Sequence, residues 1–422
     1  MTDHARYTSE LADELGPDVR ERFIRYVKID TQADEDSETF PSTAKQLDLS
    51  RILVDELLAM GVADARLEDG YVLASLEGTS GSTPVALFAH VDTSPDAPGG
   101  GVKPRVIEKY DGSDITYDAN PELILSPKES PDLRAQKGRD VITSDGTTLL
   151  GADDKAGVAA IMTAVKYLQE HPEAPRPPLN ICFTPDEEVG QGISHLDLDA
   201  FGAEVGYTLD GSTAGSIEDE TFSADHMVVS FQGRQTHPGA AKDKMVNALR
   251  LAGRFIDALP YDEAPETTSG REGFVHPASI EGTSSGITIK LILRDFDTDL
   301  LTERGRRVRA LAEEIVAPFA AGSVEVTISQ QYRNMKDHLR VRPEIADIAH
   351  RAIEAAGLTP IRGIIRGGTD GSMLTAKGLP TPNLFTGMHD IHSLKEWVSV
   401  QDMADSAATI LHLVRLWSEE AR

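Results

Sequence analysis

Apolar residues recur at three- and four-residue spacing in several stretches of the chain, a pattern typical of amphipathic helices that pack on a core. We expect helices at Val19–Ile29, Thr43–Met60, Ala156–Gln169, Ile345–Ala356 and Met403–Glu419. Between them lie short runs that favour strands, some of them without the alternation that a strand with one solvent-facing side would show. We expect these strands at Tyr71–Leu76, Val85–Ala89, Leu179–Thr184 and Glu204–Leu209. The order of strands and helices predicts an α/β domain with a mostly parallel sheet flanked by helices.

The order of elements changes after Ser212, where strand, helix, two strands, helix and strand follow one another. We expect them at His226–Gln232, Met245–Leu259, Val275–Glu281, Gly286–Arg294, Leu300–Phe319 and Ser323–Ser329. This order is typical of a ferredoxin-like sandwich of two layers. We therefore predict a main domain of residues 1–219 and 334–422 that carries an inserted α+β domain of residues 220–333. A chain of 422 residues also exceeds the size at which one core stops growing.

Composition narrows the range of partners. The formal net charge of -28 argues against a general affinity for nucleic acid or for an anionic membrane surface. The polar start of the chain and the lack of a long apolar run predict neither a signal peptide nor a membrane span, so we expect a cytoplasmic protein. The single cysteine, Cys182, lies in the apolar run LNICFTP and excludes a disulfide framework within the chain.

Acidic residues and histidines that can bind metal ions follow several of the apolar runs. They are His90 and Asp92 in LFAHVDTSPD, Asp153 in LLGADDKAG, Glu187 and Glu188 in ICFTPDEEVG, Asp210 in VGYTLDGS, and His392 in GMHDIHSLKEW. Two imidazoles and three carboxylates, one of them shared, suit two divalent ions roughly 3.5–4 Å apart, which together activate a water and polarise a carbonyl. The set predicts metal-assisted hydrolysis.

Each of these motifs alone has an ordinary structural explanation. A lone His-x-Asp is weak evidence, and Asp153 precedes a helix that it could simply cap. The adjacent acids Glu187 and Glu188 are more informative, because one can bind metal while the other takes a proton from water. Because open α/β sheets bind their ligands at the carboxyl ends of strands, the joint pattern is hard to explain by chance.

Seven motifs along the chain resemble one family over nearly the whole length: HVDTSPD, GADDKAG, FTPDEEVG, THPG, MVNAL, IRGGTDG and PNLFTG. They are similar to the peptidase T family of tripeptide aminopeptidases, within the superfamily of co-catalytic zinc aminopeptidases and carboxypeptidases. The resemblance implies a zinc-exopeptidase-like catalytic domain with an inserted lid or dimerisation domain. It also implies that two Zn²⁺ ions are bound, that short peptides are the substrates, and that the protein forms a homodimer.

The same resemblance implies a role for individual residues. His90 and Asp210 would bind one zinc ion, Glu188 and His392 the other, and Asp153 would bridge them, with a cis peptide bond between Asp153 and Asp154. Asp92 would orient His90, and Glu187 would be the general base. The residues expected to contact substrate are His237, Asn247, Arg294, Arg366 and Gly367.

One segment departs from the family pattern. Relatives usually read Tyr-His-Gly-Lys-His-Glu-Phe where this chain has Ile391 to Trp397 in the order Ile-His-Ser-Leu-Lys-Glu-Trp. His392 keeps its place, although His389 is a nearby alternative ligand. A dizinc dipeptidase, carboxypeptidase or N-acyl amino acid deacylase on the same scaffold is the main alternative function. A binding protein that has kept the fold without catalysis is the other, and Glu187 beside Glu188 argues against it.

Overall fold

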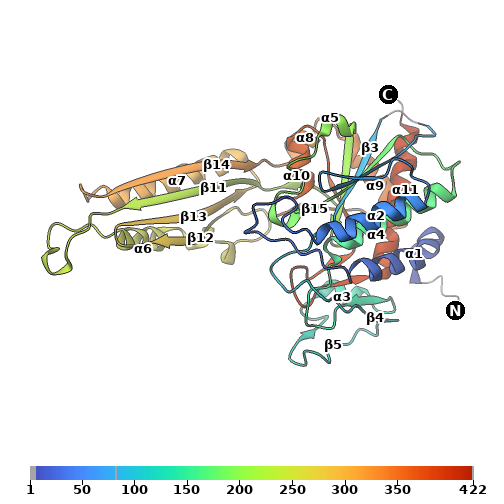
Figure 1. The fold of residues 1–422 in the computed structure, drawn as a ribbon, viewed down its shortest axis with the longest axis horizontal. Helices are drawn as coiled ribbons and strands as arrows, with labels where there is room; N and C mark the ends of the chain where they lie inside the picture. The colour runs from blue at the N-terminus through green and yellow to red at the C-terminus, as the bar shows by residue number, and fades with distance from the viewer. Residues whose placement is uncertain (1–5, 81–82, 421–422) are drawn as a thin grey trace. The chain divides into compact units, whose positions relative to one another are not determined.

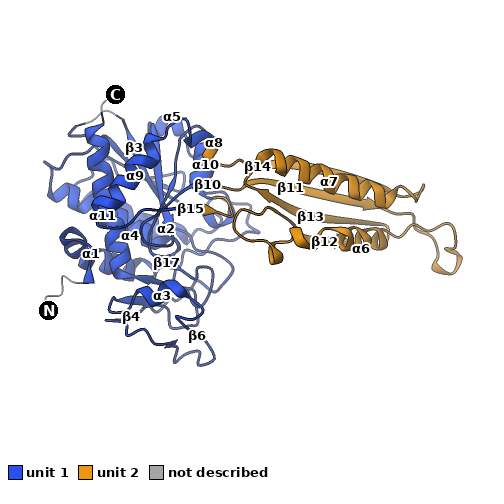
Figure 2. Cartoon of the chain, turned by 180° about the vertical axis from the view of Figure 1, so that it is seen from behind, with its two compact units in different colours: residues 1–219, 337–363, 369–422 blue, residues 220–336, 364–368 orange. Residues whose placement is uncertain are grey.

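The computed structural model describes residues 6–80 and 83–420, and the chain divides into two compact units (Figures 1 and 2). Unit 1 comprises residues 1–219, 337–363 and 369–422, and unit 2 comprises residues 220–336 and 364–368. Unit 2 thus covers the segment expected as an insertion and adds a short return segment. Within unit 2 that segment joins the start of the insertion, because the backbone N–H of Phe222 donates to the carbonyl of Ile365 over 3.1 Å.

An eight-stranded sheet with the order β1-β2-β8-β3-β9-β16-β10-β15 forms the centre of unit 1. Neighbouring strands among β8, β3, β9 and β16 are parallel, whereas β1 with β2, β2 with β8, and β10 with β16 pair antiparallel. The bounds are β1 Arg66–Glu68, β2 Tyr71–Leu76, β3 Val85–His90, β8 Leu179–Thr184, β9 Val205–Gly211, β10 Ser216–Thr221, β15 Ile361–Ile365 and β16 Asn383–Phe385. The predicted mainly parallel sheet is confirmed, with its parallel part in the middle.

Helices pack on this sheet from two sides. The long helix α4 contacts β3 and β9, and α1 and α11 contact α4. A separate hydrophobic cluster joins Phe88 of β3 and Cys182 of β8 to Leu374 of α10 and to Phe201 of α5. The helices of unit 1 are α1 Glu10–Tyr26, α2 Gln46–Ala59, α3 Pro131–Ala135, α4 Ala152–Glu170, α5 Leu198–Phe201, α9 Glu344–Ala355, α10 Asp370–Ala376 and α11 Val400–Glu419, and α8 Lys336–Leu339 begins at the boundary between the units.

The long segment between β3 and α4 contains short strands and the helix α3. Its strands β4 (Arg105–Ile107) and β7 (Val141–Thr143) join β17 (Met388–His389) and β18 (Trp397–Ser399) in a second sheet, of order β17-β18-β7-β4. Strands β5 (Ile115–Thr116) and β6 (Ile124–Leu125) form a small hairpin. The second sheet fixes both ends of the loop that carries His392.

Unit 2 has the predicted strand-helix-strand-strand-helix-strand order. Its sheet is antiparallel throughout with the order β12-β13-β11-β14, the ferredoxin-like arrangement, and α6 and α7 contribute to its core. The bounds are β11 Ser223–Gln232, α6 Ala248–Ala258, β12 Phe274–Gly282, β13 Gly286–Asp295, α7 Thr298–Val316 and β14 Ser323–Tyr332.

Local predictions were wrong mainly at helix starts. Helix α1 begins at Glu10, well before Val19, because the Ser9 side chain caps it and Pro17 is accommodated inside the helix. Helix α10 follows the glycine-rich motif IRGGTDG and begins with a capping box formed by Thr369 and Ser372. No helix among residues 6–80 and 83–420 combines the length and the apolar character needed to cross a membrane.

Candidate active site

The carboxyl ends of neighbouring strands bring the predicted metal ligands together in unit 1. His90 is the last residue of β3, Glu187 and Glu188 follow β8, and Asp210 lies near the end of β9. These three strands are adjacent in the sheet, in the order β8-β3-β9. Parallel strands end at the same edge of a sheet, so side chains that are far apart in the sequence converge there.

Asp153, in the first turn of α4, lies between two imidazoles. Its Oδ1 is 2.9 Å from Nε2 of His90, and its Oδ2 is 3.2 Å from Nε2 of His392. A further carboxylate accompanies each imidazole: Asp210 Oδ1 lies 3.6 Å from His90 Nε2, and Glu188 Oε2 lies 2.9 Å from His392 Nε2. The two carboxylate oxygens of Asp153 thus face two separate pairs of candidate ligands. Its peptide bond to Asp154 is cis.

The donor set fits metal ions. Around a tetrahedral zinc with bonds of about 2.0 Å, ligand atoms are about 3.3 Å apart, close to the separations among these residues. Candidate donor atoms of His90, Asp153 and Glu188 lie within 4.8 Å of one another. The buried Oε1 of Glu188 has no hydrogen-bond partner among the described residues, so it is available for a cation.

The pKa values of these side chains reflect an excess of buried acids. Burial, together with the neighbouring charge of Asp153, raises the pKa of Glu188 to about 7 and that of Asp210 to about 8. Burial would lower the pKa of His392, but hydrogen bonds with Asp153 and Glu188 outweigh it and raise the pKa to about 11. In the protein alone, protons therefore compensate the clustered negative charge, and divalent cations could take over that role.

Asp92 is buried and organises the site in a way that the sequence did not reveal. Its Oδ1 accepts the backbone N–H of Glu187 and its Oδ2 that of Glu188, each over 3.1 Å. The Nδ1 atom of His90 lies 3.1 Å from the backbone oxygen of Asp92 and 3.3 Å from its carboxylate. Asp92 therefore holds the turn of the two glutamates as well as facing His90, the role we predicted for it.

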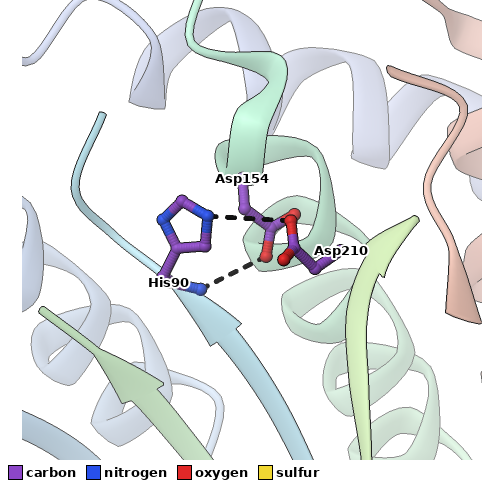
Figure 3. Close-up of side chains that lie close together, drawn as sticks. All are labelled: His90, Asp154 and Asp210. Atoms are coloured by element: carbon purple, nitrogen blue, oxygen red, sulfur yellow. Dashed lines mark hydrogen bonds and ion pairs between the residues drawn. The ribbon is translucent and has the colours of Figure 1, made fainter. Parts of the chain in front are cut away.

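Asp154 also lies beside His90 and Asp210 (Figure 3). Its Oδ2 accepts the backbone N–H of His90 over 3.2 Å, and its Oδ1 accepts the backbone N–H of Gly157 over 3.1 Å. Burial, with the charge of Asp210 adding to it, raises the pKa of Asp154 well above its ordinary value. Because both oxygens bind backbone groups, Asp154 is better explained as a support for β3 and α4 than as a ligand.

Glu187 has the surroundings that a proton acceptor needs. Its side chain is half-buried, and no hydrogen bond joins its carboxylate to another residue in the described part of the chain. Burial raises its pKa well above the ordinary value, the charge of His90 opposes this, and Asp210, Asp370 and Glu188 add to it. A carboxylate free of protein donors can bind a water instead.

The alternative ligand His389 belongs to a different environment. Its ring stacks on Trp397 with the ring centroids 4.3 Å apart, and its nearest acidic partner is Asp132, 3.7 Å from Nδ1. In contrast, His392 lies beside Asp153 and Glu188, and its Nδ1 faces Asp96 over 3.1 Å. Of the two histidines, only His392 is placed with the candidate ligands.

The predicted substrate contacts at His237, Asn247, Arg294, Arg366 and Gly367 belong to unit 2. His237 and Asn247 cap local turns, and Arg366 donates to the carbonyls of Gly270 and Glu272 and stacks on Phe222. These contacts engage the Arg366 guanidinium within unit 2.

Arg294 differs from these residues. Its guanidinium lies over the Tyr332 ring, 5.4 Å from the ring centroid, and donates to the carbonyl of Leu293. The neighbouring acids are engaged elsewhere, since Asp295 pairs with Arg304 and Asp297 caps α7. Neither of these acids forms an ion pair with Arg294. Arg294 is a half-buried cation that no ion pair engages among the described residues, and the carboxylate that acts on its charge, Asp225, pairs closely with Arg333.

Comparisons with known proteins identify the family of this chain. The model of peptidase family M20/M25/M40 matches residues 145–416. The peptidase T of Desulfitobacterium hafniense (strain Y51) is 46% identical to this chain over 404 residues, which cover 95% of this chain and 98% of the relative. The peptidase T of Clostridium perfringens (strain 13 / Type A) is 43% identical over 405 residues, which cover 95% of this chain and 99% of the relative.

Solved structures share the fold. The aminopeptidase PepT from Bacillus cereus ATCC 10987 has a TM-score of 0.73 at 24% identity and is matched over 95% of this chain and 98% of that one. A tripeptidase from Staphylococcus aureus subsp. aureus mu50 has a TM-score of 0.76 at 21% identity, over 96% and 99%. The family model and the sequence relatives named peptidase T establish that this chain belongs to peptidase family M20/M25/M40.

Proposed function

We propose that this protein is a zinc-dependent aminopeptidase that releases the N-terminal residue from tripeptides. The observation that supports it best is the position of Asp153, whose two carboxylate oxygens face His90 and His392 separately. In this proposal Asp153 would hold both Zn²⁺ ions, His90 and Asp210 would complete one site, and Glu188 and His392 would complete the other. Bound there, the ions would lower the pKa of a water and polarise the scissile carbonyl.

The protein groups of the proposed mechanism lie around this centre. Glu187 accepts the proton of the attacking water and returns it to the leaving amine, a role that its free carboxylate oxygens permit. Asp92 holds Glu187 and Glu188 in place through their backbone N–H groups. The pKa of Glu187 is raised, which brings it closer to the pKa values of the attacking water and the leaving amine with which this residue exchanges protons.

Selection of tripeptides requires a cation that binds the carboxylate of the substrate. Arg294 is our candidate, because a guanidinium can hold a carboxylate through two parallel hydrogen bonds and no ion pair engages Arg294 among the described residues. We include His237, Asn247, Arg366 and Gly367 as further substrate contacts, with His237 donating to the developing oxyanion.

Hydrolysis rates across di-, tri- and tetrapeptides, with free and with blocked N-termini, test the function. A tripeptide aminopeptidase cleaves free tripeptides best and loses activity when the N-terminus is acylated. Preference for N-acylated substrates would instead indicate a deacylase, and preference for dipeptides a dipeptidase. Metal analysis of the active protein tests zinc, and cell fractionation and sedimentation test the proposed cytoplasmic location and homodimer.

A further inference from the structure

A buried carboxylate from the far end of the chain holds the turn that precedes α4. Glu396 is 1% exposed. Its Oε2 accepts the backbone N–H groups of Leu150 and Gly151 over 2.6 and 2.7 Å, and its Oε1 accepts the backbone N–H of Asp153 over 3.0 Å. Both oxygens of this one side chain are thus occupied by backbone donors of a single turn.

These bonds replace the cap that α4 lacks locally. Gly151, at the N-cap of α4, has a left-handed backbone with φ 80° and has no side chain to cap the helix. The first N–H groups of a helix have no partner inside it, and a negative charge near them is favourable. Glu396, which lies 245 residues beyond Gly151, supplies the acceptor oxygens.

The capped turn contains Asp153, the proposed bridging ligand. The bond from the Asp153 N–H to Glu396 fixes the backbone from which the Asp153 carboxylate reaches His90 and His392. A shift of the Asp153 backbone would displace both of its carboxylate oxygens together. Both proposed metal sites therefore depend on the position of this backbone.

Glu396 also belongs to the loop that carries the other histidine. His392 lies in the segment between β17 and β18, and Glu396 directly precedes β18. The indole N–H of buried Trp397 donates to Asp390 Oδ2 over 2.9 Å, which closes this loop. A single carboxylate therefore links the loop with His392 to the turn with Asp153.

We propose that Glu396 is a positioning residue that sets the distance between the bridging ligand Asp153 and the ligand His392, and that metal affinity depends on it. This inference rests on the proposed dinuclear function of the site. Partners that orient metal ligands typically contribute 10–100-fold to metal affinity or activity.

Glu396→Gln is the sharpest variant, because it keeps the size of the side chain and exchanges one acceptor oxygen for an NH₂ group. An amide oxygen can still accept from Leu150 and Gly151, but the NH₂ group then faces the N–H of Asp153, donor against donor. Glu396→Asp keeps the charge and is too short to reach all three donors. Asp405→Asn is the matched control, since Asp405 is equally buried in α11 and pairs with Thr8 away from the site.

The test measures zinc affinity by competition with a chromophoric chelator, the visible spectrum of the Co²⁺-substituted protein, and thermal unfolding of the metal-free protein. We expect Glu396→Gln to weaken zinc binding about 10–100-fold and to change the Co²⁺ spectrum. Glu396→Asp should have an intermediate effect, and Asp405→Asn should change only the unfolding temperature. Steady-state kinetics of the loaded Glu396→Gln protein should show a lower kcat with a nearly unchanged KM.

Three results would overturn the proposal: a folded Glu396→Gln protein with wild-type zinc affinity and spectrum, an equal loss of affinity in Asp405→Asn, or failure of both Glu396 variants to fold. The last result would make Glu396 a general folding residue. Failure of the proposed function is distinguishable, because wild-type protein that binds zinc and cleaves no tripeptide would refute the peptidase activity and leave the metal titrations informative.

Discussion

Replacement of Asp92 by Asn should separate the supporting role of this residue from metal ligation. The Asp92 carboxylate is fully buried and accepts one backbone N–H from Glu187 and one from Glu188. An amide has a single acceptor oxygen, so the variant must leave one of these N–H groups facing an NH₂ group. His90 keeps a second acceptor for its Nδ1, the backbone oxygen of Asp92.

The expected loss of activity in Asp92→Asn follows from the hydrogen bonds that the substitution removes. A hydrogen bond to a charged group contributes about 1.5–3 kcal/mol, and an unsatisfied buried N–H costs about 1–3 kcal/mol. The free energy that holds the two glutamates in position should therefore fall by about 2–4 kcal/mol. If this loss is felt fully in the transition state, kcat/KM decreases about 30–1000-fold. We expect most of it in kcat, because Glu187 acts in proton transfer.

The assay is steady-state hydrolysis of a tripeptide by protein whose metal content and unfolding temperature have been measured. Asp96→Asn is the control, since Asp96 also faces a histidine, His392, but its side chain is 66% exposed. An exposed pair contributes about 0–1 kcal/mol, so this variant should lose less than about fivefold. Fully metallated Asp92→Asn with a kcat/KM within twofold of wild type would refute the reasoning.

Three further predictions concern other residues of the proposed site. Glu187→Gln should retain zinc and lower kcat about 10²–10⁴-fold, and near-normal turnover of metallated protein would exclude it as the general base. Asp153→Ala should lower the occupancy of both metal sites, whereas metal analysis showing one lost equivalent would make Asp153 a terminal ligand. Arg294→Met should cost several kcal/mol, about 2–5, in kcat/KM for tripeptides and blunt their preference over tripeptide amides. Equal cleavage of tripeptides and their C-terminal amides by the wild type would contradict carboxylate recognition.

Local pattern was sufficient for elements that are buried over most of their length. The strands at Tyr71–Leu76 and Leu179–Thr184 have the bounds that their apolar runs predict, because all but one residue of each is buried and the strand carries its signal in its own residues. The order of strands and helices also predicted both folds, since short connections and right-handed crossovers leave few topologies. Motif resemblance identified the family and suggested the metal ligands.

Contacts between distant residues could not be read in this way. Glu396 looked like one residue of a divergent segment, and its role depends on a turn near Gly151 that only the fold brings beside it. The sequence likewise does not show that the Asp154 oxygens accept the backbone N–H groups of His90 and Gly157. Hydrogen bonds from a buried acid to distant backbone N–H groups produce no periodic pattern in the sequence. Any buried acid can accept such bonds, so the sequence does not show which one does.

The sequence by itself therefore determined the secondary structure of the buried elements, the order in which they occur and the chemistry that its side chains can perform. The tertiary structure decided which acid faces which donor: Asp92 the amides of the two glutamates, Asp153 the two imidazoles, and Glu396 the start of α4. The physical reason is that burial and periodicity are local properties of a chain, whereas the partner of a buried charge is set by where the parallel strands end and the loops return.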